Sequence, residues 1–113
     1  MKILVYGAGT IGLTYAWLLS PNNQVDVFIR KKSIRNYSPT VNLSIKDLRK
    51  NDKAYKKYSY SPNYVTEIVK KYDLIIVAVN SSQTTNVMKE LSILKEKGII
   101  LILQNNWNIE EKL

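Results

Sequence analysis

The chain has 113 residues, 45% of them hydrophobic, which is enough for one folded domain with a buried core. It contains neither cysteine nor histidine, so disulfides, thiolate metal sites and the Ser-His-Asp triad are excluded. No apolar run approaches the roughly 18 residues of a membrane helix, and we expect a cytoplasmic protein without membrane contact.

The formal net charge of +8 is concentrated in one segment. Ten of the 17 basic residues lie between Arg30 and Lys57, where the only acids are Asp47 and Asp52. Such a segment attracts anions, for example a phosphate or a nucleic acid. We favour the simpler interpretation of a lysine-rich hairpin kept solvated by its charge over a nucleic-acid surface, although its tyrosines would suit base stacking.

The first thirty residues predict a strand, a helix and a second strand. Residues 2–6 are apolar strand formers that lead into a glycine-rich turn at 7–12. Apolar residues then recur at helical spacing until the sequence SPNN at 20–23 ends the helix. Residues 24–29 predict the second strand, which completes a βαβ unit.

The middle of the chain is less regular. Residues 40–61 combine alternating apolar positions, tyrosines and a charged centre, which predicts a two-stranded excursion or hairpin. Residues 65–72 predict a short helix.

The last third returns to alternating strands and helices. Residues 73–79 are almost continuously apolar and predict a central parallel strand. A helix over 82–97 follows, Gly98 is placed to end it, and 99–103 predict another buried strand. The predicted fold is therefore a Rossmann-type, doubly wound α/β domain with a mainly parallel sheet and a small β excursion at 40–61.

Sites in such sheets lie beyond the carboxyl ends of the strands. In this sequence those ends are the segments 7–12, 30–32, 80–83 and 104–108, and all four carry glycine or polar residues. We therefore expect the functional site at this edge of the sheet.

The turn GAGTIG matches the dinucleotide-binding pattern GxGxxG in its expected context, after a strand and before a helix. Gly7 would allow the tight turn, Gly9 would let a pyrophosphate approach the backbone, and Gly12 would let the helix pack on the sheet. The simpler alternative is a glycine-rich turn without a ligand. We assign the whole turn to cofactor binding: Gly7, Ala8, Gly9, Thr10, Ile11 and Gly12.

The end of the second predicted strand favours NADP(H) over NAD(H). NAD sites usually place an acid there to bind the ribose 2′-hydroxyl. This strand instead ends in Arg30, Lys31 and Lys32, and Asp26 falls too early. The planar guanidinium of Arg30 suits a 2′-phosphate. The alternative is that these are solvated loop charges.

The sequence AVNSSQ at 78–83 and the sequence LQNNWNIEEKL at 103–113, together with GAGTIG and Arg30, resemble ketopantoate reductase (2-dehydropantoate 2-reductase). The resemblance implies that Gln83 lies beside a ribose and that Asn105 lies near the nicotinamide and the substrate. Asn105 would otherwise satisfy loop backbone groups. Asn80 takes the place of a family lysine at the cofactor, and Lys31 or Lys32 would compensate for the missing charge. Asn106 and Asn108 replace family glycines.

The same resemblance implies hydride transfer from NADPH to a 2-oxo acid, 2-dehydropantoate, in pantothenate biosynthesis. The family takes its catalytic lysine and glutamate from a helical C-terminal domain, which these residues do not include. We therefore expect residues 1–113 to be an NADP(H)-binding domain of a longer reductase, inactive alone and without a catalytic residue or metal site of its own. The alternative is a stand-alone, non-catalytic dinucleotide-binding domain like the regulatory domains of potassium transporters.

Overall fold

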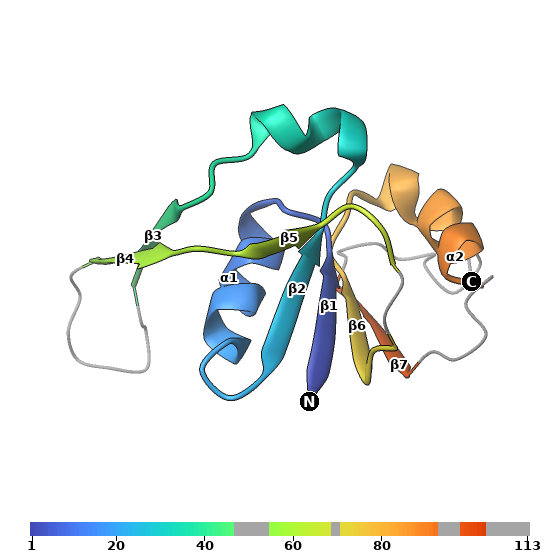
Figure 1. Cartoon of the computed structure of the whole chain (residues 1–113), viewed down its shortest axis with the longest axis horizontal. Helices are drawn as coiled ribbons and strands as arrows, with labels where there is room; N and C mark the ends of the chain where they lie inside the picture. The colour runs from blue at the N-terminus through green and yellow to red at the C-terminus, as the bar shows by residue number, and fades with distance from the viewer. Residues whose placement is uncertain (47–54, 69–70, 93–97, 104–113) are drawn as a thin grey trace.

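The computed structural model describes residues 1–46, 55–68, 71–92 and 98–103 (Figure 1). A five-stranded sheet, with all neighbours parallel, has the order β5-β2-β1-β6-β7. The predicted doubly wound α/β fold is confirmed. Its elements are β1 (Lys2–Tyr6), α1 (Thr10–Leu19), β2 (Gln24–Phe28), β5 (Asn63–Val65), β6 (Leu74–Val77), α2 (Thr84–Ser92) and β7 (Ile99–Ile102).

The two helices cover opposite faces of the sheet. On one face, Leu4 of β1 packs in the same core cluster as Val87 and Leu91 of α2. On the other face, Val5 belongs to a cluster with Ala16 of α1. Alternate residues of β1 are therefore buried on both sides, which explains why the strand is continuously apolar.

Helix α1 ends where the sequence predicts. The hydroxyl of Ser20 donates to the carbonyl of Trp17 at 3.0 Å, and the side-chain amide of Asn23 donates to the carbonyl of Leu19 at 2.9 Å. These bonds satisfy carbonyls that the helix leaves without a partner. The outward face of α1 is also apolar and is exposed in this structure, with Ile11, Tyr15 and Leu18.

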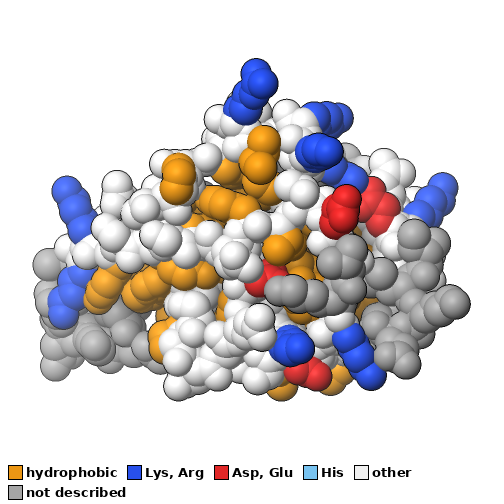
Figure 2. All heavy atoms as spheres, viewed as in Figure 1, with side chains coloured by type: hydrophobic (Ala, Val, Ile, Leu, Met, Phe, Trp, Pro, Cys, Tyr) orange, Lys and Arg blue, Asp and Glu red, His pale blue; other side chains and the backbone are white. Residues whose placement is uncertain are grey.

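The expected excursion at 40–61 is an antiparallel hairpin of β3 (Val41–Ile45) and β4 (Lys56–Tyr60), which extends to one side of the sheet (Figure 1). The ring of Tyr58 lies 4.7 Å from the ring of Trp17 on α1, measured between centroids. Figure 2 shows apolar side chains gathered between the hairpin and α1. The hairpin is therefore held to the body of the domain by aromatic packing, while most of β4 is exposed.

The predicted helix over 65–72 is wrong for its described part. Val65 ends β5, a short strand that pairs in parallel with β2, and no helix follows in 66–68. Val65, Ile68 and Tyr72 all contact the same core cluster, so their spacing resembles that of a helix although each reaches the core from extended or bent backbone. Residues 69–70 lie outside the described part.

Two further expectations about the last third need correction. Helix α2 begins at Thr84 after a 3-10 turn at Ser81–Gln83, not at 82, and 93–97 lie outside the described residues. Strand β7 is not fully buried, because Ile99 is 73% exposed and Leu101 is 43% exposed. It is the edge strand of the sheet, and within the described residues only one of its faces packs on the core.

Candidate functional site

A hollow of about 480 Å³ lies beyond the carboxyl ends of β1, β2 and β6. It is the edge of the sheet where sites of this fold class occur. Its lining comes from the ends of these strands, the glycine turn, the segments after β2 and β6, and the start of α2. The lining residues are Tyr6, Gly7, Ala8, Gly9, Phe28, Ile29, Arg30, Lys32, Ser33, Tyr37, Ala78, Val79, Asn80, Gln83, Asn86 and Val87.

The three glycines of the turn have different roles. Gly7 has a φ of +122°, and a Cβ there would meet the backbone carbonyl of Ala78. A Cβ on Gly12 would meet the carbonyl of Gly7, so α1 approaches the turn too closely for a side chain. A Cβ on Gly9 would have nothing within 4 Å. Gly7 and Gly12 are therefore required by the fold, whereas Gly9 leaves open space beside the hollow.

The amino end of α1 is free to receive an anion. Gly9 is the N-cap residue and supplies no side-chain cap, and the first turn carries no acid. The first backbone N–H groups of a helix have no partner within the helix, and together with the helix dipole they favour negative charge. The turn therefore has the properties of a phosphate-binding site.

Arg30 follows β2 in extended backbone, just before the 3-10 helix η1 (Lys31–Asn36). Its guanidinium carbon lies 5.9 Å from the ring centroid of Tyr6 and 5.8 Å from that of Phe28, so both rings support the cation. Its Nη1 lies 2.6 Å from a carboxylate oxygen of Glu90 on α2. Hydrogen bonding to Glu90 is the main reason that the pKa of Arg30 is raised, and the group stays charged.

The hydroxyl of Tyr6 donates a hydrogen bond to the second carboxylate oxygen of Glu90. Burial and then this bond raise the pKa of Tyr6 above its ordinary value. The ring of Tyr6 also packs on Phe28, with 4.6 Å between centroids. Both oxygens of Glu90 are thus engaged by residues at the ends of neighbouring strands.

The structure brings most of the predicted site residues together. Those that line the hollow are Gly7, Ala8, Gly9, Arg30, Asn80 and Gln83. The remaining turn residues, Thr10, Ile11 and Gly12, begin α1 and do not line it, and Lys32 rather than Lys31 does. Asn105 lies outside the described residues, as do Gln104, Asn106 and Asn108.

Sequence reasoning missed the contribution of α2. Asn86 and Val87 line the hollow, and Glu90 reaches Arg30 at its rim. Gln83, Val87 and Glu90 follow one another at helical spacing of three or four residues. The sequence shows this spacing, but its helical pattern was used only to predict the buried, apolar side of the helix, so Glu90 was not assigned to the site.

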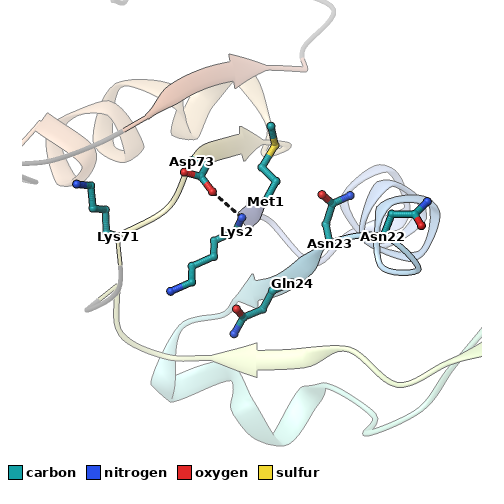
Figure 3. A pocket seen from close by; sticks show the side chains of 7 residues that line it. All are labelled: Met1, Lys2, Asn22, Asn23, Gln24, Lys71 and Asp73. Carbon is teal, nitrogen blue, oxygen red and sulfur yellow. Dashed lines mark hydrogen bonds between the residues drawn. The ribbon is translucent and has the colours of Figure 1, made fainter.

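A second hollow, of about 610 Å³, lies at the amino ends of the strands (Figure 3). Its side chains include Lys2, Lys71 and Asp73, and the backbone N–H of Lys2 donates to the carboxylate of Asp73 at 2.8 Å. It has neither a glycine turn nor a helix N-terminus in its lining. Its position and lining therefore make it a poor candidate for a dinucleotide.

Within the described residues, no cluster of three or more acids could hold a metal ion. The same part of the chain has no helix with the length and apolarity needed to cross a membrane.

The overall structure resembles solved structures of two reductases and a dehydrogenase. A probable 2-dehydropantoate 2-reductase from Bacillus subtilis superposes with a TM-score of 0.76 at 26% identity, over 98% of this chain and 36% of that one. A D-mandelate dehydrogenase solved with NADH and anilino(oxo)acetate gives 0.71 at 21% identity, over 99% of this chain and 36% of that one. A dimeric ketopantoate reductase from Staphylococcus aureus superposes with a TM-score of 0.59 at 20% identity, over 95% of this chain and 34% of that one. This chain thus spans about a third of the length of these structures.

No curated protein sequence gives a significant match. The family model described as ketopantoate reductase PanE/ApbA, however, matches residues 3–113, which is nearly the whole chain. The predicted resemblance is therefore confirmed, and the chain belongs to the ketopantoate reductase family.

Proposed function

We propose that the chain is the NADP(H)-binding domain of an oxidoreductase that reduces a 2-oxo acid, with 2-dehydropantoate as the substrate that the family implies. The observation that carries this proposal is that Gly9 and Arg30 line the same hollow at the carboxyl end of the sheet. One hollow therefore combines a turn suited to a pyrophosphate with a cation suited to a 2′-phosphate.

The residues at the hollow fit the groups of NADP(H). The pyrophosphate would meet the backbone at Gly9 and the first N–H groups of α1, where no side chain stands in the way. The 2′-phosphate would meet Arg30, and Lys32 also lines the hollow. Gln83 would contact a ribose. Asn80 would replace the family lysine with a neutral amide, so Lys32 would supply part of the missing charge.

Bound NADPH would supply the hydride for the carbonyl of the substrate. The residues of this chain would bind and orient the cofactor. Asn105, which follows β7, would lie near the nicotinamide and the substrate. The lysine and glutamate that the family uses in catalysis belong to a helical domain outside these residues. We therefore expect the chain alone to bind nucleotide without turning over 2-dehydropantoate, and an NADPH oxidation assay tests this.

The cofactor assignment is tested by titrating NADPH and NADH against the wild type and Arg30→Ala. We expect NADPH to bind more tightly than NADH, because only NADPH offers Arg30 a phosphate. Loss of a charge-assisted, two-pronged contact should weaken NADPH by about tenfold or more. NADH affinity should change by less than about threefold.

Arg35→Ala is the matched control, because Arg35 is an exposed arginine on η1 that does not line the hollow. It removes the same charge and should leave the ratio of the two affinities unchanged. Equal binding of NADPH and NADH, with no effect of Arg30→Ala on either, would overturn the NADP(H) assignment.

A further inference from the structure

Four side chains meet at the rim of the hollow: Tyr6 of β1, Phe28 of β2, Arg30 from the segment after β2, and Glu90 of α2. We call them the rim cluster. Arg30 rests over the rings of Tyr6 and Phe28 and pairs with Glu90 at 2.6 Å. Glu90 also accepts a hydrogen bond from Tyr6. Figure 2 shows acidic and basic side chains in contact on the side of the molecule where α2 lies.

The position of Glu90 changes the chemistry of the rim. The segment after β2 contains no acid, which is what favours NADP(H) from the sequence. The structure brings an acid to the same place from α2, 84 positions after Tyr6 in the chain. Arg30 therefore already has an anionic partner, and that partner occupies part of the guanidinium fork that a phosphate would use.

The carboxylate and a 2′-phosphate would compete for Arg30. A phosphate monoester carries between one and two negative charges near neutral pH, so it would be repelled by a carboxylate left in contact with the same cation. A ribose 2′-hydroxyl, by contrast, is neutral and can donate a hydrogen bond to a carboxylate. Glu90 therefore opposes NADP(H) more than it opposes NAD(H).

We propose that Glu90 is a specificity-determining residue that competes with the 2′-phosphate for Arg30. It thereby reduces the ratio of the affinity for NADP(H) to the affinity for NAD(H). This inference rests on the proposed function of the hollow. The pair is half-exposed, with 47% of the Arg30 side chain and 36% of the Glu90 side chain accessible, so Glu90 could turn into solvent when a phosphate arrives, at the cost of its bonds to Arg30 and Tyr6. Exposed ion pairs are weak, so the competition should change affinity by about two- to fivefold.

The test compares two mononucleotides that differ only by the phosphate in question, 2′,5′-ADP and 5′-AMP, by calorimetric titration of the full chain. Glu90→Gln removes the charge and keeps the shape. It should tighten 2′,5′-ADP by about two- to fivefold and change 5′-AMP by less than about twofold. Tyr6→Phe removes the hydrogen bond that anchors Glu90 and should act in the same direction with a smaller effect. Glu67→Gln is the control, because Glu67 is exposed and does not line the hollow.

The outcomes separate this inference from the function on which it rests. If 2′,5′-ADP binds the wild type more tightly than 5′-AMP, and Glu90→Gln leaves their ratio unchanged or tightens both equally, the role of Glu90 is wrong and the proposed function stands. The same conclusion follows if Glu67→Gln shifts the ratio as much as Glu90→Gln does. If neither mononucleotide binds the wild type, both the proposed function and the inference are overturned.

Discussion

The hydroxyl of Tyr72 donates a 2.7 Å hydrogen bond to the carboxylate of Asp26, which is 1% exposed in the middle of β2. The other carboxylate oxygen accepts from the side-chain amide of Asn63 on β5 at 2.6 Å. A buried charge is tolerated only when its hydrogen bonds are satisfied. Asp26 therefore joins the edge strand β5 and the approach to β6 to strand β2.

Tyr72→Phe should destabilise the fold without affecting nucleotide binding. It removes one hydrogen-bond donor from a buried carboxylate, which costs about 1–3 kcal/mol. Urea denaturation measures this cost. Tyr15→Phe is the control, because Tyr15 is 38% exposed on the outward face of α1 and its replacement should cost less than about 0.5 kcal/mol. Equal stability of the two variants would show that the bond to Asp26 contributes nothing.

Alkaline pH should weaken the fold through Tyr72. Burial, followed by the bond to Asp26, raises the pKa of Tyr72 above its ordinary value of 10.0. Because the folded state holds this proton more tightly, the contribution of Tyr72 to stability is complete below pH 10 and is lost as the pH rises above it. The free energy of unfolding of the wild type should therefore fall more steeply above pH 10 than that of Tyr72→Phe. Parallel curves for the two proteins would contradict the assignment.

Gly9→Ser should separate binding from folding. Serine is a good N-cap residue and the space around Gly9 is open, so stability should stay within about 0.5 kcal/mol of the wild type. The new hydroxyl would accept hydrogen bonds from the helix N–H groups that a pyrophosphate needs. The serine side chain would also fill the space that the pyrophosphate would occupy. Nucleotide affinity should fall by about tenfold or more, as measured by NADPH fluorescence.

Gly12→Ala is the contrasting variant. Its Cβ would meet the carbonyl of Gly7, so α1 or the turn must shift, at a cost of about 1–3 kcal/mol. A Gly9→Ser protein that binds NADPH as tightly as the wild type would show that the pyrophosphate does not approach this turn.

A buried and an exposed isoleucine on the neighbouring strands β6 and β7 allow a test of how much each strand contributes to stability. Ile76 on β6 is 1% exposed, and Ile76→Ala should cost about 2–5 kcal/mol through lost burial and a cavity. Ile99 on β7 is 73% exposed, and Ile99→Ala should cost less than about 1 kcal/mol. Thermal unfolding followed by circular dichroism compares them. A large loss for Ile99→Ala would mean that β7 is covered in solution.

The fold class followed from the sequence because β1 and β6 are apolar runs buried on both faces. Such runs are typical of the strands of a parallel sheet that helices cover on both sides. β5 did not follow, because three residues are too short for a pattern. At the sheet edge it pairs in parallel with β2, and the side-chain bond between Asn63 and Asp26 joins the two strands across 37 positions of the chain.

The site was predictable in part for a similar reason. The glycine turn and Arg30 are local signals, since each stands directly after a strand. Glu90 is not, because its place at the rim depends on how α2 crosses the end of the sheet. The apolar residues of α2 predict which side of the helix is buried, but the sequence does not distinguish an acid on its polar side from an ordinary solvated charge. The structure places Glu90 beside Arg30.

The contact between Trp17 and Tyr58 has a practical consequence. The chain contains two tryptophans, Trp17 and Trp107, so Trp107→Phe leaves a single indole, which lies against the β3–β4 hairpin. The emission of that indole responds to whether the phenol ring stays packed on it or gives way to water. The protein thus carries an optical reporter for the position of its own hairpin, readable in real time and without an attached dye.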